Sequence, residues 1–275
     1  MINSYSKVNL NLKVIGKKNN LHNIESLVFW LDLCDKIIIK KNSLKIDRVS
    51  FKGKYKKFIN NKNTVVKTLS LLRQLKYVSN HQGYNINIKK NIPVFSGLGG
   101  GSSNAAFLIK YFSKNKLKKR DLKTFQHKVS SDIILFLFGP KILQRDIYSV
   151  QNIKTKLNLH FVLIFPGFKC ETKKIYAKVR KYSFKSKFFG TNCKTVLDFA
   201  KSSNNDLENI AIKFYPKLKK IINFLQNYTN CEFSRLSGSG STCFAVFKTR
   251  KNALIALKKI KRNFPQYSSV LAKSI

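Results

Sequence analysis

Cysteine is scarce in this chain, and its spacing excludes two kinds of stabilised small domain. The 275 residues include five cysteines, an odd number, and no two of them form a CxxC pair. A disulfide framework or a structural zinc site needs paired cysteines at short spacing. Neither is expected, and a reducing cytoplasm is the predicted setting of Cys34, Cys170, Cys193, Cys231 and Cys243.

Long apolar runs are also missing. A membrane-spanning helix needs about 18 or more consecutive apolar residues, and no such run occurs in the sequence. The first residues, Met1 to Lys7, lead into a polar–apolar alternation without the apolar segment of a signal peptide. We therefore expect a cytoplasmic protein that has no membrane partner.

Acidic residues and arginine are rare beside lysine. There are 12 Asp and Glu against 54 Lys and Arg, which gives a formal net charge of +42, and 46 of these cations are Lys. A basic face attracts nucleic acid, but such binders usually cluster their cations and use Arg for phosphate geometry. Here Lys is spread along the chain beside 27 Asn, a composition that an A/T-rich genome favours. We expect no specific nucleic-acid partner.

The remaining composition is that of a globular protein. Hydrophobic residues make up 43% of the chain, enough for a core, and the length fits one large domain or two ordinary ones. Strand and helix patterns alternate on both sides of a boundary near residues 148–157, so we expect a mixed α/β chain with domains 1–150 and 151–275. Strands are predicted at residues 8–14, 36–39, 84–88, 160–165, 243–247 and 269–272, and helices at 63–77, 105–112, 118–129, 205–214, 216–228 and 253–260.

Glycine is concentrated at two points. Six of the 12 glycines lie within residues 97–101 and 238–240. The first stretch follows a strand pattern and opens a helical one, an arrangement that binds phosphate through free N–H groups and the helix dipole. The second stretch, taken alone, is equally typical of a plain hairpin. The residues of this stretch predicted to contact phosphate are Pro93, Val94, Phe95, Ser96, Gly97, Leu98, Gly99, Gly100, Gly101, Ser102 and Ser103.

This glycine pattern differs from two well-known nucleotide-binding motifs. No Lys follows the last glycine, as GxxxxGK[ST] requires, and Ser102 occupies the sixth position of GxGxxG. An ordinary tight turn would need only one or two glycines, so phosphate binding is favoured. Ser102 and Ser103 could cap the helix or turn a hydroxyl toward a phosphate-bound metal.

These residues resemble a known superfamily. Pro93 to Ala106 is similar to the phosphate-binding motif shared by galactokinase, homoserine kinase, mevalonate kinase and phosphomevalonate kinase. Three more stretches resemble, in order, the opening, the adenine-side segment and the C-terminal glycine loop of the 4-diphosphocytidyl-2-C-methyl-D-erythritol kinase family. They are Ser6 to Val14 with His22 and Glu25 to Leu33, then Asn63 to Lys67, then Ser237 to Ala245.

The resemblance implies a fold class and a reaction. The fold would be α+β with two domains, the first like ribosomal protein S5 and the second ferredoxin-like, with the active site between them. The enzyme would use ATP and Mg²⁺ to phosphorylate the 2-hydroxyl of diphosphocytidyl methylerythritol, a step of the non-mevalonate route to isoprenoid precursors. Its partner would be this small molecule, and the oligomeric state stays open.

Site residues follow from the same resemblance. Asp132, which would otherwise be interpreted as a helix cap, matches the family's catalytic aspartate, and Lys7 matches its lysine partner. The lysine would keep the carboxylate ionised and stabilise transferring charge. The implied ATP-side residue is Asn63, the metal ligand is Ser103, and the substrate-binding residues are Asn9, His22, Gly238, Ser239 and Gly240.

The sequence departs from the family pattern at three places, one of which is the lack of glycine in Lys141 to Tyr148, where the family normally has a glycine-containing segment. Ser130-Ser131-Asp132 stands where the family usually has Gly-Ala-Asp, and Leu21 stands where an aromatic residue would stack on cytosine. Two alternatives therefore stay open. The chain could be another kinase of the superfamily, acting on mevalonate or homoserine, or a basic nucleic-acid-binding protein on this scaffold.

Overall fold

The computed structural model describes residues 1–275 apart from 19–20, 62, 189 and 191. Two compact units divide the chain. Unit 1 comprises residues 1–6, 33–94 and 99–138, and unit 2 comprises residues 7–32, 95–98 and 139–275. Both units are discontinuous, because β1 (Ile2–Asn9) and the long β3 (Leu21–Asn42) each belong partly to both. The division predicted near residue 150 follows chain order and stays a prediction.

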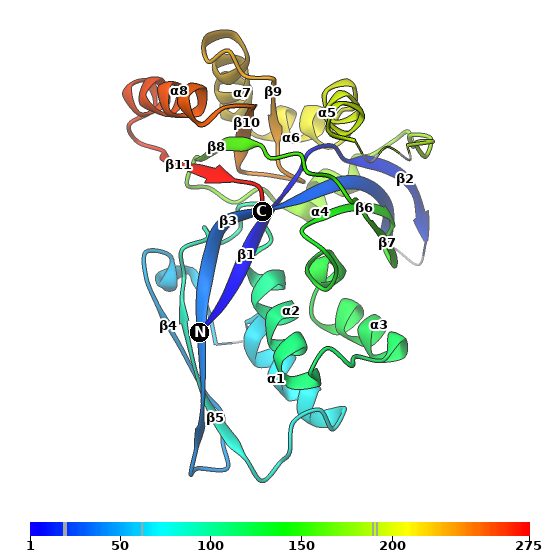
Figure 1. Cartoon of the computed structure of the whole chain (residues 1–275), viewed down its shortest axis with the longest axis vertical. Coiled ribbons are helices and arrows are strands. Elements are labelled where there is room, and N and C mark those ends of the chain that lie inside the picture. Colours follow the sequence, from blue (N-terminus) through cyan, green and yellow to red (C-terminus); the bar gives the residue numbers. More distant parts are fainter. Residues whose placement is uncertain (19–20, 62, 189, 191) are drawn as a thin grey trace. The chain divides into compact units, whose positions relative to one another are not determined.

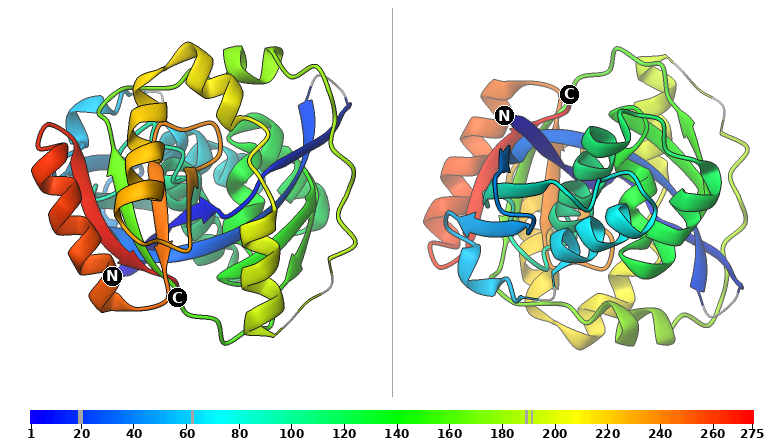
Figure 2. Two further views of the ribbon diagram at one scale, coloured as in Figure 1. Left: turned by 90° about the horizontal axis from the view of Figure 1, so that it is seen from above. Right: turned by 90° about the horizontal axis from the view of Figure 1, so that it is seen from below.

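Unit 2 contains an antiparallel sheet with helices on one face. Its strands are β8 (His160–Phe165), β9 (Phe233–Leu236), β10 (Cys243–Phe247) and β11 (Ser268–Lys273), hydrogen-bonded in the order β11-β8-β10-β9. Helices α7 (Lys217–Tyr228) and α8 (Arg250–Asn263) pack against the sheet, as Figures 1 and 2 show. This order of strands, with β8 and β10 in the centre, β9 and β11 at the edges and α8 before β11, confirms the predicted ferredoxin-like arrangement.

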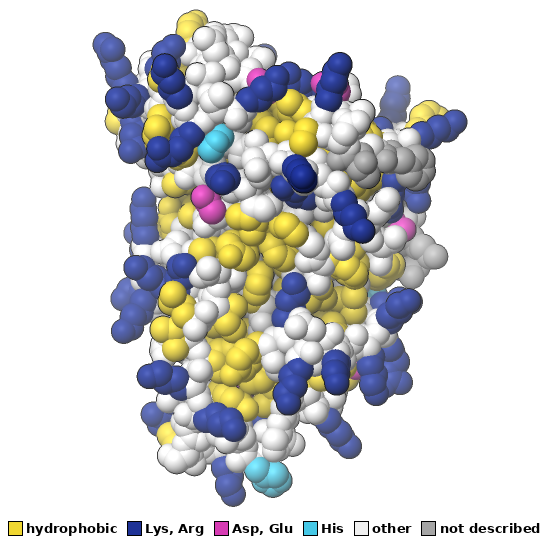
Figure 3. Space-filling model, viewed as in Figure 1, with side chains coloured by type: hydrophobic (Ala, Val, Ile, Leu, Met, Phe, Trp, Pro, Cys, Tyr) yellow, Lys and Arg dark blue, Asp and Glu magenta, His cyan; other side chains and the backbone are white. Residues whose placement is uncertain are grey.

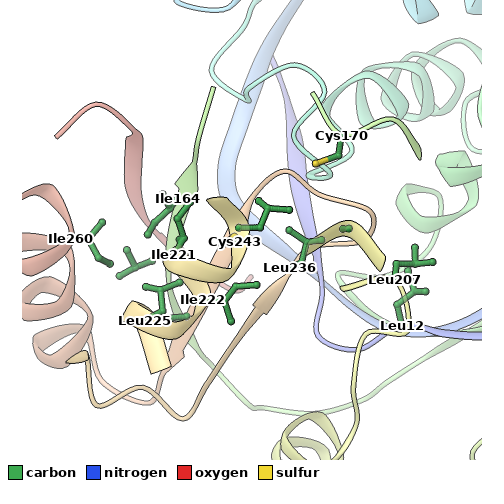
Figure 4. Close-up of a cluster of buried hydrophobic side chains, with 14 of the residues drawn as sticks. Leu12, Ile164, Cys170, Leu207, Ile221, Ile222, Leu225, Leu236, Cys243 and Ile260 are labelled. Atoms are coloured by element: carbon green, nitrogen blue, oxygen red, sulfur yellow. The ribbon is translucent and has the colours of Figure 1, made fainter. Parts of the chain in front are cut away.

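Apolar spacing explains the core of this sheet. On α7, Leu218, Ile221, Ile222 and Leu225 recur at helical spacing and are buried in the cluster that includes the strand residues. Figure 4 labels Ile221, Ile222 and Leu225 of this set. On β8, Val162 and Ile164 point to the same face, because strand side chains alternate. Each fully buried aliphatic side chain contributes about 1.5–3 kcal/mol, so this cluster is a main source of stability in unit 2.

Unit 2 also contains the first part of β3, residues 21–32, with the strands that pair with it. Residues of β3 pair with β2 (Lys13–Lys18) and with β6 (Lys141–Asp146), and β6 pairs with β7 (Ser149–Asn152), all antiparallel. Short helices follow β8 in the chain: α4 (Thr172–Ala177), α5 (Cys193–Ser202) and α6 (Glu208–Phe214).

Unit 1 is a smaller sheet with helices. Here β3 pairs antiparallel with β5 (Gly83–Lys89), and β4 (Arg48–Lys52) lies parallel to β5. The helices are α1 (Thr64–Gln74), α2 (Gly100–Ser113) and α3 (Lys119–Lys128), with the 3₁₀ segments η1 (Lys56–Phe58) and η2 (Ser131–Phe136). Ile37, Ile86 and Ile88 from the strands pack with Val65, Leu69 and Leu108 from α1 and α2.

One predicted strand is wrong. The alternation at residues 8–14 predicts a continuous strand, but β1 ends at Asn9 and β2 begins at Lys13. Between them the backbone N–H of Leu10 donates to the Leu27 carbonyl and that of Leu12 to the Asn204 carbonyl. The apolar alternation is present because Leu10 and Leu12 are both buried, yet their backbone partners come from different segments, so no single ladder forms.

Several other predicted helices and strands are present in the structure. The predicted helices at 216–228 and 253–260 and the predicted strands at 160–165 and 243–247 are present, the helix α8 being longer than predicted. Among the described residues, no helix is both long enough and apolar enough to cross a membrane.

Candidate active site

The first glycine stretch forms a turn that starts α2. Gly97 and Gly99 have φ of +78° and +72°, values at which a side chain is strained. The N–H of Ser103 donates to the Gly99 carbonyl at 2.8 Å, the first bond of the helix. Because Gly99 has no side chain with which to cap the helix, N–H groups of the first turn are left for water or an anion. This local geometry fits the predicted phosphate loop.

Within unit 2, residues 95–98 pack on the second glycine stretch. The N–H of Thr242 donates to the Ser96 carbonyl at 3.0 Å, and the Ser237 hydroxyl donates to the Gly97 carbonyl at 3.2 Å. A Cβ atom at position 97 would lie 2.4 Å from the Ser237 carbonyl oxygen, so glycine is required there. The tertiary structure therefore joins two motifs about 140 residues apart, which neither motif indicates alone.

Lys7 and Asn9 lie beside these loops. Lys7 is only 3% exposed, its ammonium donates to Asn9 Oδ1, and its backbone N–H donates to the Leu98 carbonyl at 3.0 Å. Asn9 Nδ2 in turn donates to the Ser26 hydroxyl at 2.8 Å. A Cβ atom at Gly238 would lie 3.7 Å from Lys7 Nζ and 3.3 Å from Asn9 Oδ1. Three predicted site residues, Lys7, Asn9 and Gly238, are thus in one cluster.

Two residues that the sequence did not suggest shape the second glycine loop. Gly238 and Gly240 have φ of +59° and +92°. Asn205 Nδ2 donates to the Gly238 carbonyl at 2.8 Å, and the Thr172 hydroxyl lies 2.8 Å from that of Ser239. No local signal distinguishes Asn205, since it is one of 27 Asn in the chain.

Asp132 lies in unit 1, at the start of η2. The Ser130 hydroxyl lies 2.7 Å from the Ser102 hydroxyl and accepts from the Asp132 N–H at 3.4 Å. The turn that carries Asp132 is thereby linked to the first turn of α2. Ser130 has φ of −167°, extended backbone that serine adopts freely, so the absence of the family's glycine causes no strain at this position.

Ser103 belongs to a buried polar network that the sequence analysis missed. Its hydroxyl lies 2.7 Å from that of Ser4, and Asn104 Nδ2 donates to Ser4 Oγ at 2.9 Å and to Asp35 Oδ2 at 3.0 Å. Lys90 forms a buried ion pair with Asp35. The network holds the side chains of Ser103 and Asn104, at the start of α2, in place. A metal role for Ser103, whose side chain is fully buried, stays a prediction.

Asn63 and His22 also have defined surroundings. Asn63 Oδ1 caps α1 by accepting from the N–H groups of Val65 and Val66 at 3.0 and 3.1 Å. The His22 ring lies 5.0 Å from the Tyr176 ring, centroid to centroid, at 34°. Burial, with a smaller contribution from the charge of Lys17, lowers the pKa of His22. The neighbouring Leu21 side chain is 37% exposed.

The described residues contain no group of three or more His, Cys, Asp or Glu side chains placed to hold a metal ion. Mg²⁺ that binds with a nucleotide commonly takes one or two carboxylates together with phosphate oxygens and water, a smaller set of protein ligands than such a group.

Comparison with known proteins identifies the family. Residues 63–140 match the model of the GHMP kinases N terminal domain, and residues 193–266 match that of GHMP kinases C terminal. A protein of Pelagibacter ubique (strain HTCC1062), named 4-diphosphocytidyl-2-C-methyl-D-erythritol kinase, is 37% identical over 278 residues that cover 100% of this chain and 98% of the relative. The chain belongs to the GHMP kinases.

Other GHMP kinases extend this likeness. A protein of the same name from Wolbachia pipientis wMel is 30% identical, with 95% of this chain and 94% of the relative covered. The crystal structure of a 4-(cytidine 5'-diphospho)-2C-methyl-D-erythritol kinase matches with a TM-score of 0.77 at 21% identity, covering 99% and 98% of the two chains. L. major mevalonate kinase matches with a TM-score of 0.74 at 14% identity, covering 100% and 96%. These structural matches confirm the α+β GHMP-kinase fold.

Proposed function

We propose that this GHMP kinase transfers the γ-phosphoryl group of ATP to the 2-hydroxyl of 4-diphosphocytidyl-2-C-methyl-D-erythritol. The observation that carries the proposal is the end-to-end match with relatives that bear this name, among them the one 37% identical. The packing of Lys7 and Asn9 beside Gly238 supports it, because phosphoryl transfer needs a cation and amide groups at the phosphate. The mevalonate and homoserine kinases share the fold at 18% identity or less.

ATP phosphates would bind at the first turn of α2. N–H groups there supply hydrogen bonds and a favourable field for the anion. Gly100 and Gly101 lack side chains, and a Cβ atom at Gly101 would come 3.2 Å from the Thr64 hydroxyl. The absence of a side chain at Gly101 thus lets the first turn of α2 pack closely against the start of α1. Asn63, the cap of α1, begins the segment that would bind ATP on the side of the adenine ring.

Two residues would carry the transfer. The Asp132 carboxylate takes the proton of the substrate hydroxyl, whose oxygen forms a bond to the γ-phosphorus while the bond from that phosphorus to the ADP oxygen breaks. The Lys7 ammonium, oriented by Asn9 Oδ1, stabilises negative charge on the transferring group. Transfer of this kind depends mainly on positioning and charge neutralisation, which a buried, hydrogen-bonded lysine provides.

Mg²⁺ would neutralise charge on the β- and γ-phosphates when it is bound. The hydroxyls of Ser102 and Ser103 are the protein groups that would hold it, with phosphate oxygens and water supplying the other ligands. The contacts of these hydroxyls with Ser130 and Ser4 fix their side chains. A cytoplasmic location, where ATP and Mg²⁺ are available, is part of the same proposal.

The cytidine end would lie at His22. Its lowered pKa keeps the ring neutral near pH 7, so one nitrogen can donate to the base and the other can accept. Tyr176 provides an aromatic face 5.0 Å from the His22 ring, which takes over the stacking that Leu21 cannot supply.

Turnover with a panel of alcohols tests the proposal. Purified protein is given ATP and Mg²⁺ with diphosphocytidyl methylerythritol, mevalonate or homoserine, and ADP release is followed. We expect release with the first alcohol alone. Turnover of mevalonate or homoserine without turnover of diphosphocytidyl methylerythritol would contradict the proposed substrate.

The variant Asp132→Asn belongs to the same experiment. We expect turnover to fall by at least about 100-fold, as loss of general-base catalysis typically gives 10²–10⁴-fold, while ATP still binds. Ser131→Ala is the matched control in the same turn and should keep most activity. Near-normal turnover by Asp132→Asn would remove Asp132 as the base.

A further inference from the structure

Phe95 adopts a backbone conformation that is rare for a bulky residue. Its φ is +60°, in the left-handed region where Gly97 and Gly99 of the same loop also lie. Glycine enters this region without cost, but a Phe there is strained. The Phe95 side chain is 53% exposed, so burial of the ring does not explain why the loop carries it. Strain that persists in a ligand-binding loop points to a function for the side chain.

The contact that the Phe95 ring makes is with Lys169. The Lys169 ammonium lies over the ring, 4.8 Å from its centroid, within the range of a cation–π interaction. Both residues belong to unit 2. Lys169 itself is exposed, so its charge stays available to a ligand while the ring restricts where the ammonium lies.

The backbone of Lys169 is held on both sides. The preceding Phe168 stacks on Tyr215 with centroids 5.6 Å apart, and its carbonyl accepts from the Ser241 hydroxyl. The following Cys170 is buried, and its sulfur would lie 3.2 Å from a Cβ atom at Gly240. Lys169 is therefore the outward residue of a segment that is anchored to the second glycine loop.

These contacts place the pair beside both glycine motifs. Phe95 precedes Ser96, whose carbonyl accepts from the Thr242 N–H at 3.0 Å, while Lys169 precedes Cys170, whose sulfur would lie 3.2 Å from a Cβ atom at Gly240. Lys7 approaches the same loop at Gly238. Lys7 and the segment that carries Lys169 thus both contact the second glycine loop, where a phosphate-bearing ligand would meet these two cations.

We propose that Phe95 positions the Lys169 ammonium to contact phosphate oxygens of a bound nucleoside diphosphate group. The inference rests on the proposed function, because both the donor and the acceptor of that reaction carry such a group. The shared chemistry is a diphosphate on a nucleoside, and either the adenosine or the cytidine nucleotide could supply it. Lys169 is a binding residue in this scheme, and Phe95 is the residue that positions it.

Binding of ADP and of CDP, measured by calorimetry without turnover, tests the proposal and separates the two sources. Lys169→Met should lower the affinity for one of the two nucleotides about 5- to 20-fold, the loss typical of one charge-assisted hydrogen bond. Weakening of ADP alone assigns Lys169 to the donor, and weakening of CDP alone assigns it to the acceptor. Unchanged binding of both nucleotides overturns the proposal.

Variants of Phe95 distinguish positioning from a structural role. Phe95→Gly removes the strained side chain, so we expect an unchanged or raised melting temperature together with the same loss of nucleotide affinity as Lys169→Met. Phe95→Tyr keeps a ring and should retain the affinity. A lower melting temperature with unchanged affinity in Phe95→Gly would show that the ring acts only in the fold and would overturn the positioning role.

A charge-matched control separates this contact from general attraction by the basic surface. Lys219→Met removes one exposed cation from α7 and should leave both affinities within about 2-fold of the wild type. An equal loss in Lys219→Met would overturn the specific role of Lys169. Because these measurements need no turnover, a failure of the proposed reaction in the alcohol panel stays distinguishable from a failure of this inference.

Discussion

At the scale of single residues, burial and nearby charge decide the protonation state of His22. Burial disfavours the imidazolium, and the cation of Lys17 disfavours it further, so the pKa of His22 lies below its usual 6.5. Between the folded-state pKa and 6.5 the unfolded chain binds more protons than the folded chain. The contribution of His22 to stability is therefore fully present above pH 6.5 and is lost as the pH falls through the lower folded-state pKa.

We predict that the free energy of unfolding falls as the pH is lowered below about 6.5, the unfolded-state pKa of His, and that His22→Gln reduces this slope. NMR titration of the His22 ring should give a midpoint below that value. The pKa of His160 is also lowered by burial, so part of the dependence of the free energy of unfolding on pH should remain in His22→Gln. The double variant His22→Gln/His160→Gln should reduce that dependence further. A His22 midpoint above 6.5 would be incompatible with the environment described.

At the scale of elements, the start of α2 depends on a polar network beneath it. Asp35 Oδ1 accepts from the N–H groups of Asn91 and Ile92 at 2.8 and 2.9 Å, and Asp35 Oδ2 accepts from Asn104 and Lys90. One carboxylate from β3 thus holds the chain entering the glycine loop and the second turn of the helix leaving it. Asp35 and Lys90 are both buried, so almost none of either charged side chain is exposed to solvent.

We predict that Asp35→Asn lowers the free energy of unfolding by about 3–5 kcal/mol, because it leaves the Lys90 ammonium buried without its counter-charge. The double variant Asp35→Asn/Lys90→Met should recover part of this loss, which urea denaturation will measure. Lys174→Met, which breaks the exposed Glu171–Lys174 pair on α4, serves as control and should cost less than about 1 kcal/mol. A similarly small loss for Asp35→Asn would refute the network's role.

At the scale of the whole molecule, the net charge of +42 is spread out. On the face that Figure 3 shows, Lys and Arg side chains are scattered over many elements. Scattered lysines attract any polyanion without reading its sequence, and salt screens that attraction strongly. The same field would help to gather nucleotide substrates.

We predict that the protein binds single-stranded RNA without sequence preference and that this binding weakens steeply between 50 and 200 mM salt, by about 10³-fold if six or more phosphates are contacted. Fluorescence anisotropy with oligonucleotides of different sequence will measure it. The Asp132→Asn variant should bind RNA equally well. A preferred RNA sequence whose binding survives 200 mM salt would instead favour the nucleic-acid-binding alternative.

Local signals predicted one half of the candidate site. The glycine stretch at 97–101 stands out because glycine is rare in this chain, and positive φ at Gly97 and Gly99 shows why a side chain is excluded there. The spacing of apolar residues likewise predicted α7 and β8, since helix and strand periodicity are local properties. The strand predicted at 8–14 was wrong, because partners such as Asn204 lie far along the chain.

Tertiary contacts supplied the other half. Asn205, Thr172, Tyr176 and Lys169 carry no local signal, and a chain with 46 Lys and 27 Asn conceals functional residues of these types. The resemblance to GHMP kinases predicted Lys7 and Asp132 as catalytic residues, whereas hydrogen-bond partners such as Asn9 and Ser130 became known only from the fold. The pairing of the two glycine loops depends on Gly97 fitting against the Ser237 carbonyl, which spacing cannot reveal.

The sequence by itself determined the scarcity of acids, cysteines and glycines, the periodicity of the main elements and the membership of a kinase family, because each of these depends only on which residues are present and on their order. The tertiary structure decided which lysines are buried, which carbonyls accept and which side chains are strained. Those properties depend on contacts between distant segments: Lys7 is buried against the Leu98 backbone, and Lys169 is held over the Phe95 ring.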